Sequence, residues 1–216
     1  MTIVLSPHSV RSEDAPKQLS TLRFLSDLAY DVGRNDLPIA ICRVLMTADR
    51  SYEYLVRSFW PCLEDILLIE HDIVPTLDQF YSIINCKHQF CAGVYYMYYD
   101  YYTDNQPHYS ASRWINGVAQ QVEENEEWAQ YPSLGFVKFG APRPKIDFEN
   151  AWKNGMDKIW NNFDSLIQMT FLQAQYNQTY PGLVPDYFRP WHLHWPIVTH
   201  NNPSLQKFPK LRMPPL

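Results

Sequence analysis

Apolar and polar positions alternate in blocks along the first half of the chain, and these blocks predict strands and helices in turn. Short apolar runs rich in β-branched residues are typical of buried strands, whereas apolar residues three and four apart are typical of amphipathic helices. The predicted elements are a strand at residues 2–6, a helix at 15–33, a strand at 37–45, a helix at 50–60, a strand at 65–69 and a helix at 76–84. Because strand and helix alternate three times, we expect right-handed crossovers and a largely parallel sheet that helices cover on both faces.

Two of these helices carry further local signals. The helix at 15–33 ends at Gly33, a natural helix stop, and places four leucines on one face. These leucines are Leu19, Leu22, Leu25 and Leu28. The helix at 76–84 begins with Thr76 and Gln79 at the spacing of a capping box, in which the two side chains satisfy backbone N–H groups of the first turn.

The pattern changes after residue 90. Residues 91–99 and 134–140 resemble strands, and the acidic stretch at 120–132 between them predicts a solvated face or a mobile loop. Residues 148–174 predict a long amphipathic helix with an apolar stripe that faces the core. The second half of the chain therefore contains fewer strand–helix units than the first half.

The composition limits what the chain can be. A chain of 216 residues, 46% of them hydrophobic, can bury one substantial core, so we expect a single α/β domain over residues 1–200 with a Pro-rich, basic tail at 201–216. A net charge of −5 and a charged fraction of 19% exclude a general attraction to nucleic acid or anionic lipid, although local patches stay open. The four cysteines have no CxxC spacing and predict reduced thiols.

Signals for membrane insertion or export are missing from the sequence. No apolar run approaches the roughly 20 residues of a membrane-spanning helix. Charged residues follow the start of the chain too soon for a secretory leader. We therefore expect a soluble, cytoplasmic protein without a membrane partner.

A polar triplet, Glu70, His71 and Asp72, directly follows the apolar run at residues 65–69. In open parallel α/β sheets, ligands bind beyond the carboxyl ends of the strands, which is where this triplet falls. Carboxylates suit hard divalent cations, and such a cation can neutralise a diphosphate. The triplet is therefore a candidate metal and nucleotide site. The alternative is that Glu70 or Asp72 caps the following helix or pairs with an arginine.

A second polar group, His192, His194 and His200, lies in the segment "WHLHWPIVTH". In an extended segment His192 and His194 point to the same side, whereas His200 can reach a different place beyond Pro196. One of these imidazoles could complete a carboxylate metal site. A histidine-rich strand edge with rings bridged by solvent is the alternative.

Four segments together resemble a known family. The segments are "DILLIEHDIVPTLDQF", "CKHQFCAGVYY", "PSLGFVKFG" and "HLHWPIVTH", and they occur in that order. The series resembles the compact, often phage-encoded or actinobacterial glycosyltransferases of the GT-A fold, which have an acidic EHD triplet in place of the DxD motif and a histidine near the C-terminus. The resemblance covers Thr2 to His200. It implies a GT-A-like sheet with a Rossmann-like nucleotide-binding half.

The resemblance also implies a role for individual residues. Asp72 and His200 would hold Mn²⁺ or Mg²⁺, Glu70 would contact the nucleotide ribose or a metal-bound water, and His71 would fill the variable middle position of the motif. Ser6 and Pro7 would line the pocket for the base of a UDP-sugar, and Gly135 would let the backbone approach the sugar. The expected enzyme transfers a hexose, of the UDP-glucose type, to a hydroxyl acceptor. Charge that develops on the leaving diphosphate would be stabilised by the cation.

The catalytic base and the acceptor are less constrained. Asp164 and Asp186 are candidate bases, and the alternative for each is an ordinary exposed acid. Residues 187–216 contain four basic residues, several aromatic residues and no acid, so they could touch phosphates and stack on bases. Phage-type relatives make 5-hydroxymethylcytosine, or another hydroxymethylated pyrimidine in bacteriophage DNA, a possible acceptor, and place the enzyme in the host cytoplasm. The alternative is a proline-rich strap that packs over the core.

Two other functions are alternatives to the metal-dependent glycosyltransferase. A catalytically idle GT-A-like module would bind a sugar nucleotide or a partner protein. A metal hydrolase built on the three C-terminal histidines would break down nucleotide sugars without an acceptor. The sequence contains neither GxxxxGK(S/T) nor GxGxxG, which argues against a kinase-type or dinucleotide-type site.

Overall fold

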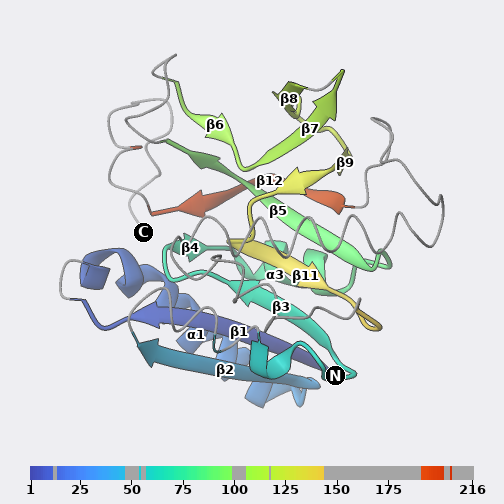
Figure 1. Cartoon of the computed structure of the whole chain (residues 1–216). Helices are drawn as coiled ribbons and strands as arrows, with labels where there is room; N and C mark the ends of the chain where they lie inside the picture. Colours follow the sequence, from blue (N-terminus) through green and yellow to red (C-terminus); the bar gives the residue numbers. More distant parts are fainter. Residues whose placement is uncertain are drawn as a thin grey trace, which may run out of the picture.

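A mixed β-sheet runs through the middle of the molecule, and its main strand order is β2-β1-β3-β11-β5-β12-β4 (Figure 1). Two short strands extend it, because β6 pairs with β5 and β9 pairs with β12. The strands are β1 (Thr2–Ser9), β2 (Ile39–Met46), β3 (Asp65–Ile69), β4 (Ile73–Val74), β5 (Phe90–Met97), β6 (His108–Tyr109), β9 (Trp128–Ala129), β11 (Phe136–Phe139) and β12 (Trp191–His200). This computed structural model describes residues 1–11, 14–46, 54, 57–98, 106–116, 118–143, 191–201 and 205.

Two helices, a short helical segment at residues 57–59 and a second sheet make up the rest of the described fold, and the short segment falls within the helix predicted at residues 50–60. The helices are α1 (Ala15–Asn35) and α3 (Leu77–Ile84). The second sheet is antiparallel and has the order β10-β7-β8, formed by β10 (Tyr131–Pro132), β7 (Ala111–Ile115) and β8 (Val118–Gln121). The chain is therefore α/β, with more strand than helix among its described residues.

The main sheet is mixed, so the prediction of a largely parallel sheet holds for only part of it. Strand β1 is parallel to β2 and β3, and β12 is parallel to β5. Strand β11 is antiparallel to both of its neighbours, and β4 is antiparallel to β12. Strand β11 is antiparallel because of where it begins. Its first residue, Phe136, pairs with Ile69 at the carboxyl end of β3, so β11 runs back along β3.

Strand β1 continues past Pro7, where the sequence predicts that it ends. Its pairing with β3 stops at Leu5, opposite Leu68, whereas its pairing with β2 continues to Ser9. Proline interrupts a sheet because it cannot donate a backbone hydrogen bond. Since Pro7 lies beyond the end of β3, that side of β1 needs no donor at this position.

Side chains alternate between two apolar clusters, one on each face of the sheet. On one face Val4, Leu67 and Ile69 pack against α1 and α3, which lie behind the sheet in Figure 1. On the other face Leu5 and Leu68 belong to a cluster that includes Trp60, Trp191 and residues of the second sheet. Helices α1 and α3 therefore cover the same face, whereas Phe59 and Trp60, at the end of the short helical segment, pack on the other. The helix predicted at residues 148–174 lies outside the described residues.

The buried face of α1 differs from the predicted leucine face. Its buried residues are Gln18, Thr21, Phe24, Leu25 and Leu28, whereas Leu19 is 51% exposed. Leucines at a strict spacing of three turn steadily around a helix of 3.6 residues per turn, so they cannot share one face over nine residues. Gly33 is a helical residue, and the helix ends at Asn35 with Asp36 in the left-handed conformation (φ 48°).

The stretch at residues 120–132 agrees with the predicted solvated face at its acidic residues, since Glu123, Glu124 and Glu127 are exposed, but its two ends are strands rather than loop. It contains the end of β8 and all of β9 and β10, and Val122, Ala129 and Gln130 are buried. Glu126 forms an ion pair of 2.7 Å with Arg113 on β7. The many acidic residues of this stretch obscure its buried residues in the sequence pattern.

None of the helices in the described part of the chain combines the length and the apolar character that a membrane crossing requires. All four cysteines, each within the described ranges, are free thiols. Apart from Asn201 and Leu205, the predicted tail at 201–216 lies outside the described residues.

The capping box of α3 is present as the sequence predicts. The Thr76 hydroxyl accepts from the Gln79 backbone N–H (3.2 Å), and the Gln79 side chain accepts from the Thr76 N–H (2.9 Å). Replacing Thr76 by Ala removes one of these bonds and should lower the free energy of unfolding by about 1 kcal/mol, measured by urea denaturation. Thr76→Ser keeps the hydroxyl and should stay near wild type, and an equal loss in both variants would contradict the role of the cap.

Candidate functional site

Asp72 and His200 meet where β4 pairs with the end of β12. Asp72 lies in the turn between β3 and β4, and His200 pairs with Ile73 across the antiparallel β4–β12 contact. This pairing places Nε2 of His200 3.3 Å from Oδ2 of Asp72. The Asp72 side chain is 18% exposed and that of His200 8%. The structure therefore brings together the two residues that the resemblance assigns to a metal, although 128 positions separate them.

The hydrogen bonds of His200 define what lies between the two side chains. Nδ1 of His200 lies 2.7 Å from the backbone oxygen of Tyr96, which can only accept, so Nδ1 carries a proton. In the neutral ring Nε2 then presents a lone pair to the Asp72 carboxylate, which is also an acceptor. Two acceptors at this distance require a positive species between them, either a second proton on the ring or a metal cation.

The charge state of Asp72 is set by opposing effects. Burial is the largest of them and disfavours the carboxylate, but the hydrogen bond from His200 and the positive charges of His200 and His71 outweigh it. The pKa of Asp72 is therefore lowered. The carboxylate stays ionised at neutral pH, which is the form that binds a cation.

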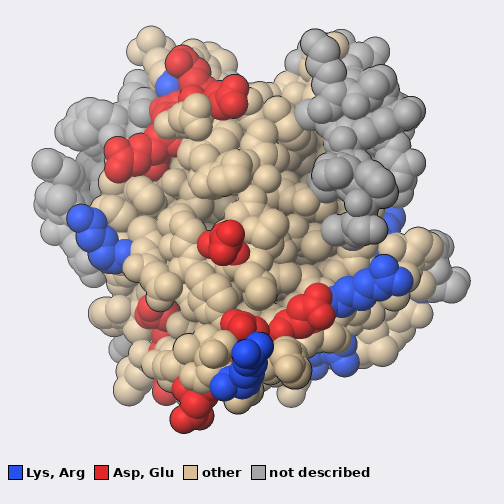
Figure 2. Space-filling model, turned by 180° about the vertical axis from the view of Figure 1, so that it is seen from behind, with Lys and Arg blue, Asp and Glu red and all other residues tan. Residues whose placement is uncertain are grey.

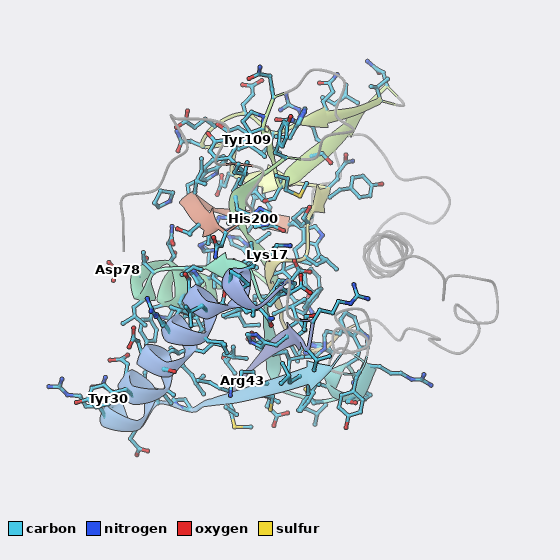
Figure 3. The ribbon with its side chains drawn as sticks, turned by 90° about the vertical axis from the view of Figure 1, so that its left-hand side faces the viewer. Lys17, Tyr30, Arg43, Asp78, Tyr109 and His200 are labelled. Atoms are coloured by element: carbon cyan, nitrogen blue, oxygen red, sulfur yellow. The ribbon has the colours of Figure 1, made fainter. Side chains whose placement is uncertain are left out.

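The first turn of α1 lies next to this pair. The backbone N–H of Asn201 donates to the Asp72 carbonyl oxygen (2.7 Å), and the Asn201 side chain donates to the Lys17 carbonyl oxygen (3.0 Å). Figure 3 shows Lys17 and His200 close together, with Tyr109 farther away on the other side of His200. Lys17 forms an ion pair of 3.5 Å with Asp14. Asn201 thus ties the first turn of α1 to the Asp72 turn, while the Lys17 ammonium group is paired with Asp14.

Glu70, Tyr95 and Gly135 pack against one another beside His200. The Glu70 N–H donates to the Gly135 carbonyl oxygen (2.8 Å), and the Gly135 N–H donates to the Tyr95 hydroxyl (3.2 Å). A Cβ at residue 135 would lie 2.5 Å from the Tyr95 oxygen and 3.1 Å from Oε2 of Glu70. Only glycine fits this approach. The ring of Tyr95 stands edge-on to His200, with centroids 5.1 Å apart.

Ser6 and Pro7 lie at the carboxyl end of β1, with both side chains buried. The Ser6 hydroxyl lies 2.9 Å from the Ile69 carbonyl oxygen and 3.0 Å from Nε2 of His8. Nδ1 of His8 lies 3.1 Å from Oε1 of Gln18, a carbonyl oxygen that can only accept, so Nδ1 carries the proton. Buried hydrogen bonds therefore tie the ends of β1 and β3 to α1.

A cavity of about 210 Å³ opens between the end of β5 and the second sheet. It is lined by Met97, Ser110, Ser112, Gln121, Tyr109 and Tyr131 among others. The cavity and the Asp72–His200 pair are connected through β5. Met97 lines the cavity, and the preceding residue, Tyr96, accepts the hydrogen bond from His200 through its backbone oxygen. Its mixture of hydroxyl, amide and aromatic groups suits a polar ring such as a sugar or a base.

A cluster of Cys86, Cys91, His192 and His194 is a second candidate metal site, which the sequence analysis missed. One ligand atom from each residue lies within 4.8 Å of all the others. Burial, and then the hydrogen bond with Cys86, raises the pKa of the Cys91 thiol, and burial lowers the pKa of His194 to about 4. The signal in the sequence was two close pairs, Cys-x4-Cys and His-x-His. Because only CxxC was considered as a metal-binding spacing of cysteines, this signal was not detected.

The two candidate bases stay untested. Asp164 and Asp186 lie outside the described residues. His71 is half-buried in the turn between β3 and β4 and contributes positive charge near Asp72.

Comparison of the chain with protein-family models gives no matching family, and a search of curated proteins gives no significant match.

Burial of His8 predicts a pH dependence of stability. Burial, the largest effect, lowers the pKa of His8 from 6.5 to about 4. Below pH 6.5 the unfolded chain therefore binds a proton that the folded protein binds only near pH 4. The free energy of unfolding should fall by up to about 3 kcal/mol over this interval, since each pKa unit corresponds to about 1.4 kcal/mol.

Urea denaturation of wild type and His8→Gln at a series of pH values measures how much of the pH dependence of stability comes from His8. Glutamine has no proton to gain, so the stability of the variant should decline less steeply between pH 6.5 and 4. Parallel profiles for the two proteins would show that His8 is not held neutral by the fold.

Proposed function

We propose that the protein is a metal-dependent, GT-A-like glycosyltransferase that uses a nucleotide sugar, of the UDP-hexose type, as its donor. One observation carries the proposal: the Asp72 carboxylate and Nε2 of His200 face each other 3.3 Å apart at the carboxyl end of the parallel strands, where a metal cation can take the place of a ring proton between them. Adjacent ligands of an octahedral cation such as Mg²⁺, bound at about 2.0–2.1 Å, lie about 3 Å apart. The two side chains fit such an ion.

The residues around the pair suit a diphosphate. Open α/β sheets bind ligands beyond the carboxyl ends of their parallel strands, which here are the ends of β1 and β3. The first turn of α1 lies on the same side, because Asn201 bonds to the carbonyl oxygens of both Asp72 and Lys17. The Gly135 carbonyl oxygen accepts from the Glu70 N–H and so fixes the turn that leads to Asp72, while Tyr95 and Glu70 fill the space where a side chain at residue 135 would lie. These features support the donor-binding role that the resemblance assigns to this region.

Charge defines the roles of these residues in the proposed reaction. A bound divalent cation would stabilise the negative charge that grows on the diphosphate as the sugar–phosphate bond breaks. Asp72 and His200 would hold the cation, and the hydrogen bond from Nδ1 to Tyr96 would keep Nε2 of His200 turned toward it. Because this charge is greatest in the transition state, loss of Asp72 should reduce turnover more than substrate binding.

The cavity beside β5 suits the acceptor. It lies next to Tyr96 along the chain and presents Tyr109 and Tyr131, on which a base or sugar ring could stack. A hydroxymethylated pyrimidine in DNA is one acceptor of the right size, and a base in a duplex would have to flip out to enter. The face in Figure 2 shows no continuous basic patch among the described residues, and acidic side chains gather near its top. Contact with DNA would therefore depend on other surfaces.

Ligand-induced stabilisation tests the donor site. UDP with Mn²⁺, at a hundredfold excess over the dissociation constant, should raise the thermal midpoint by about 5 to 10 °C, because such binding adds about 2.7 kcal/mol. Asp72→Asn keeps the shape but loses the charge, and should lose most of this shift. Asp27→Asn makes the same change at an exposed position of α1 and should keep the full shift. An unchanged shift in Asp72→Asn would remove Asp72 from the site.

Transfer itself can be measured by mass. The protein should be incubated with a panel of sugar nucleotides and with plain or hydroxymethylcytosine-containing DNA, after which the nucleosides are analysed by mass spectrometry. A gain of one hexose on the modified nucleoside, lost in Asp72→Asn, is the expected result. Binding of UDP-sugar without transfer to any acceptor would favour an idle sugar-nucleotide-binding module. Sugar release at the same rate without acceptor would favour a hydrolase.

A further inference from the structure

We propose that Cys86, Cys91, His192 and His194 form a zinc site that is separate from the cation site of the proposed transferase. The four residues come from two parts of the chain that the sheet brings together. Cys86 lies just after α3 and Cys91 in β5, whereas both histidines lie in β12. In the parallel β5–β12 ladder, His192 pairs with Cys91 and His194 with Gly93. The inference does not depend on the proposed glycosyltransferase function.

The distances between the ligand atoms match tetrahedral zinc. Zinc binds cysteine sulfur at about 2.3 Å and histidine nitrogen at about 2.0–2.1 Å, so tetrahedral angles put sulfur and nitrogen about 3.6 Å apart and two nitrogens about 3.3 Å apart. Sγ of Cys86 lies 3.5 Å from Nδ1 of His192. Nδ1 of His192 lies 3.2 Å from Nε2 of His194. These two distances match tetrahedral zinc, and the Cys91 thiol lies within 4.8 Å of the other three ligand atoms, from where small rotations of the side chains can bring it to the ion.

Partners on the outer side of each ring favour the ligating tautomers. Nε2 of His192 lies 3.6 Å from the Glu127 carboxylate, which favours a proton on Nε2 and leaves a lone pair on Nδ1. Nδ1 of His194 lies 3.0 Å from the Ser82 hydroxyl, whose oxygen can accept a hydrogen bond from an Nδ1–H group, and this tautomer leaves the lone pair on Nε2. These two lone pairs would then face each other beside two sulfur atoms. A cation at the centre removes the repulsion.

The surroundings hold the ligands in place. The ring of His88 stacks on His192 with centroids 4.5 Å apart, and Trp128 stands edge-on to both rings. Lys138, buried on β11, donates to the Cys86 carbonyl oxygen, which fixes the segment between α3 and β5. Cys91 is fully buried, and the other three ligands are half-buried. A site supported in this way excludes solvent from most of the ion.

The donor set distinguishes this site from the Asp72–His200 pair. Two thiolates and two imidazoles with tetrahedral spacing select zinc, whereas carboxylate oxygens suit Mg²⁺ or Mn²⁺. Four protein ligands also fill the coordination sphere, which is typical of structural zinc. His194 and His200 are six residues apart on β12, up to roughly 20 Å in an extended strand. Zinc would therefore act by fixing one end of β12, while the other end carries His200.

Metal analysis of the purified full-length protein tests the proposal. We expect one zinc ion per chain by plasma mass spectrometry after gel filtration, and loss of that zinc in Cys86→Ser and in His194→Ala. Cys42→Ser is the matched control, because Cys42 is also a half-buried free thiol but lies outside the cluster. It should keep its zinc. Substitution by Co²⁺ should give the intense visible bands of a tetrahedral thiolate site, and these bands should vanish with Cys86→Ser.

A measurement on wild type alone covers the case in which a ligand variant fails to fold. Zinc should protect the Cys86 thiol from alkylation, and a strong chelator should expose it while the reactivity of Cys42 stays unchanged. Asp72→Asn should retain the zinc even if it has lost the response to UDP and Mn²⁺, so the two sites can fail independently. Protein without zinc that also binds no added Zn²⁺ or Co²⁺, or a Cys86–Cys91 disulfide in freshly purified protein, would overturn the proposal.

Discussion

The pairing of β12 with β5 is the constraint on which both candidate sites depend. Strand β12 comes from the C-terminal part of the chain and is inserted between β5 and β4. At its start the register sets His192 opposite Cys91, and at its end it sets His200 opposite Ile73, next to Asp72. A shift of one residue would turn each histidine to the other face of the sheet. The apolar residues Trp191, Leu193 and Val198 oppose such a shift, because they are buried in the two cores.

The two polar clusters follow the same electrostatic rule. In each, polar contacts on the outer side of a histidine ring, two hydrogen bonds and the 3.6 Å contact of His192 with Glu127, orient the inner nitrogen toward another electron-pair donor. Buried acceptors that face each other are unfavourable unless a proton or a metal ion lies between them. The chemistry of the donors then separates the clusters: a carboxylate and an imidazole at one end of β12 suit a hard cation, and two thiols with two imidazoles at the other end suit zinc.

The packing of the sheet explains why these polar groups keep their positions. Alternate residues of β1 and β3 enter the two apolar clusters, so both strands are fixed on both faces up to their carboxyl ends. The chain turns there, at Glu70 to Asp72, under the close contact with Gly135 and Tyr95. Helix α3 then starts at its capping box and leads to Cys86. Helix α3 thus connects the segment that carries Asp72 to the cysteine pair.

Local sequence determined the elements whose signals lie between neighbouring residues: β3 at residues 65–69, the cap of α3 at Thr76, and the common direction of His192 and His194 in a strand. The meeting of Asp72 and His200 was also expected, from the order of motifs in a resembling family. Only the tertiary structure decided the antiparallel course of β11, the buried face of α1 and the cluster of two cysteines with two histidines. The physical reason is that periodicity is a property of adjacent residues, whereas strand order and contacts across about a hundred positions are set by burial of the whole core.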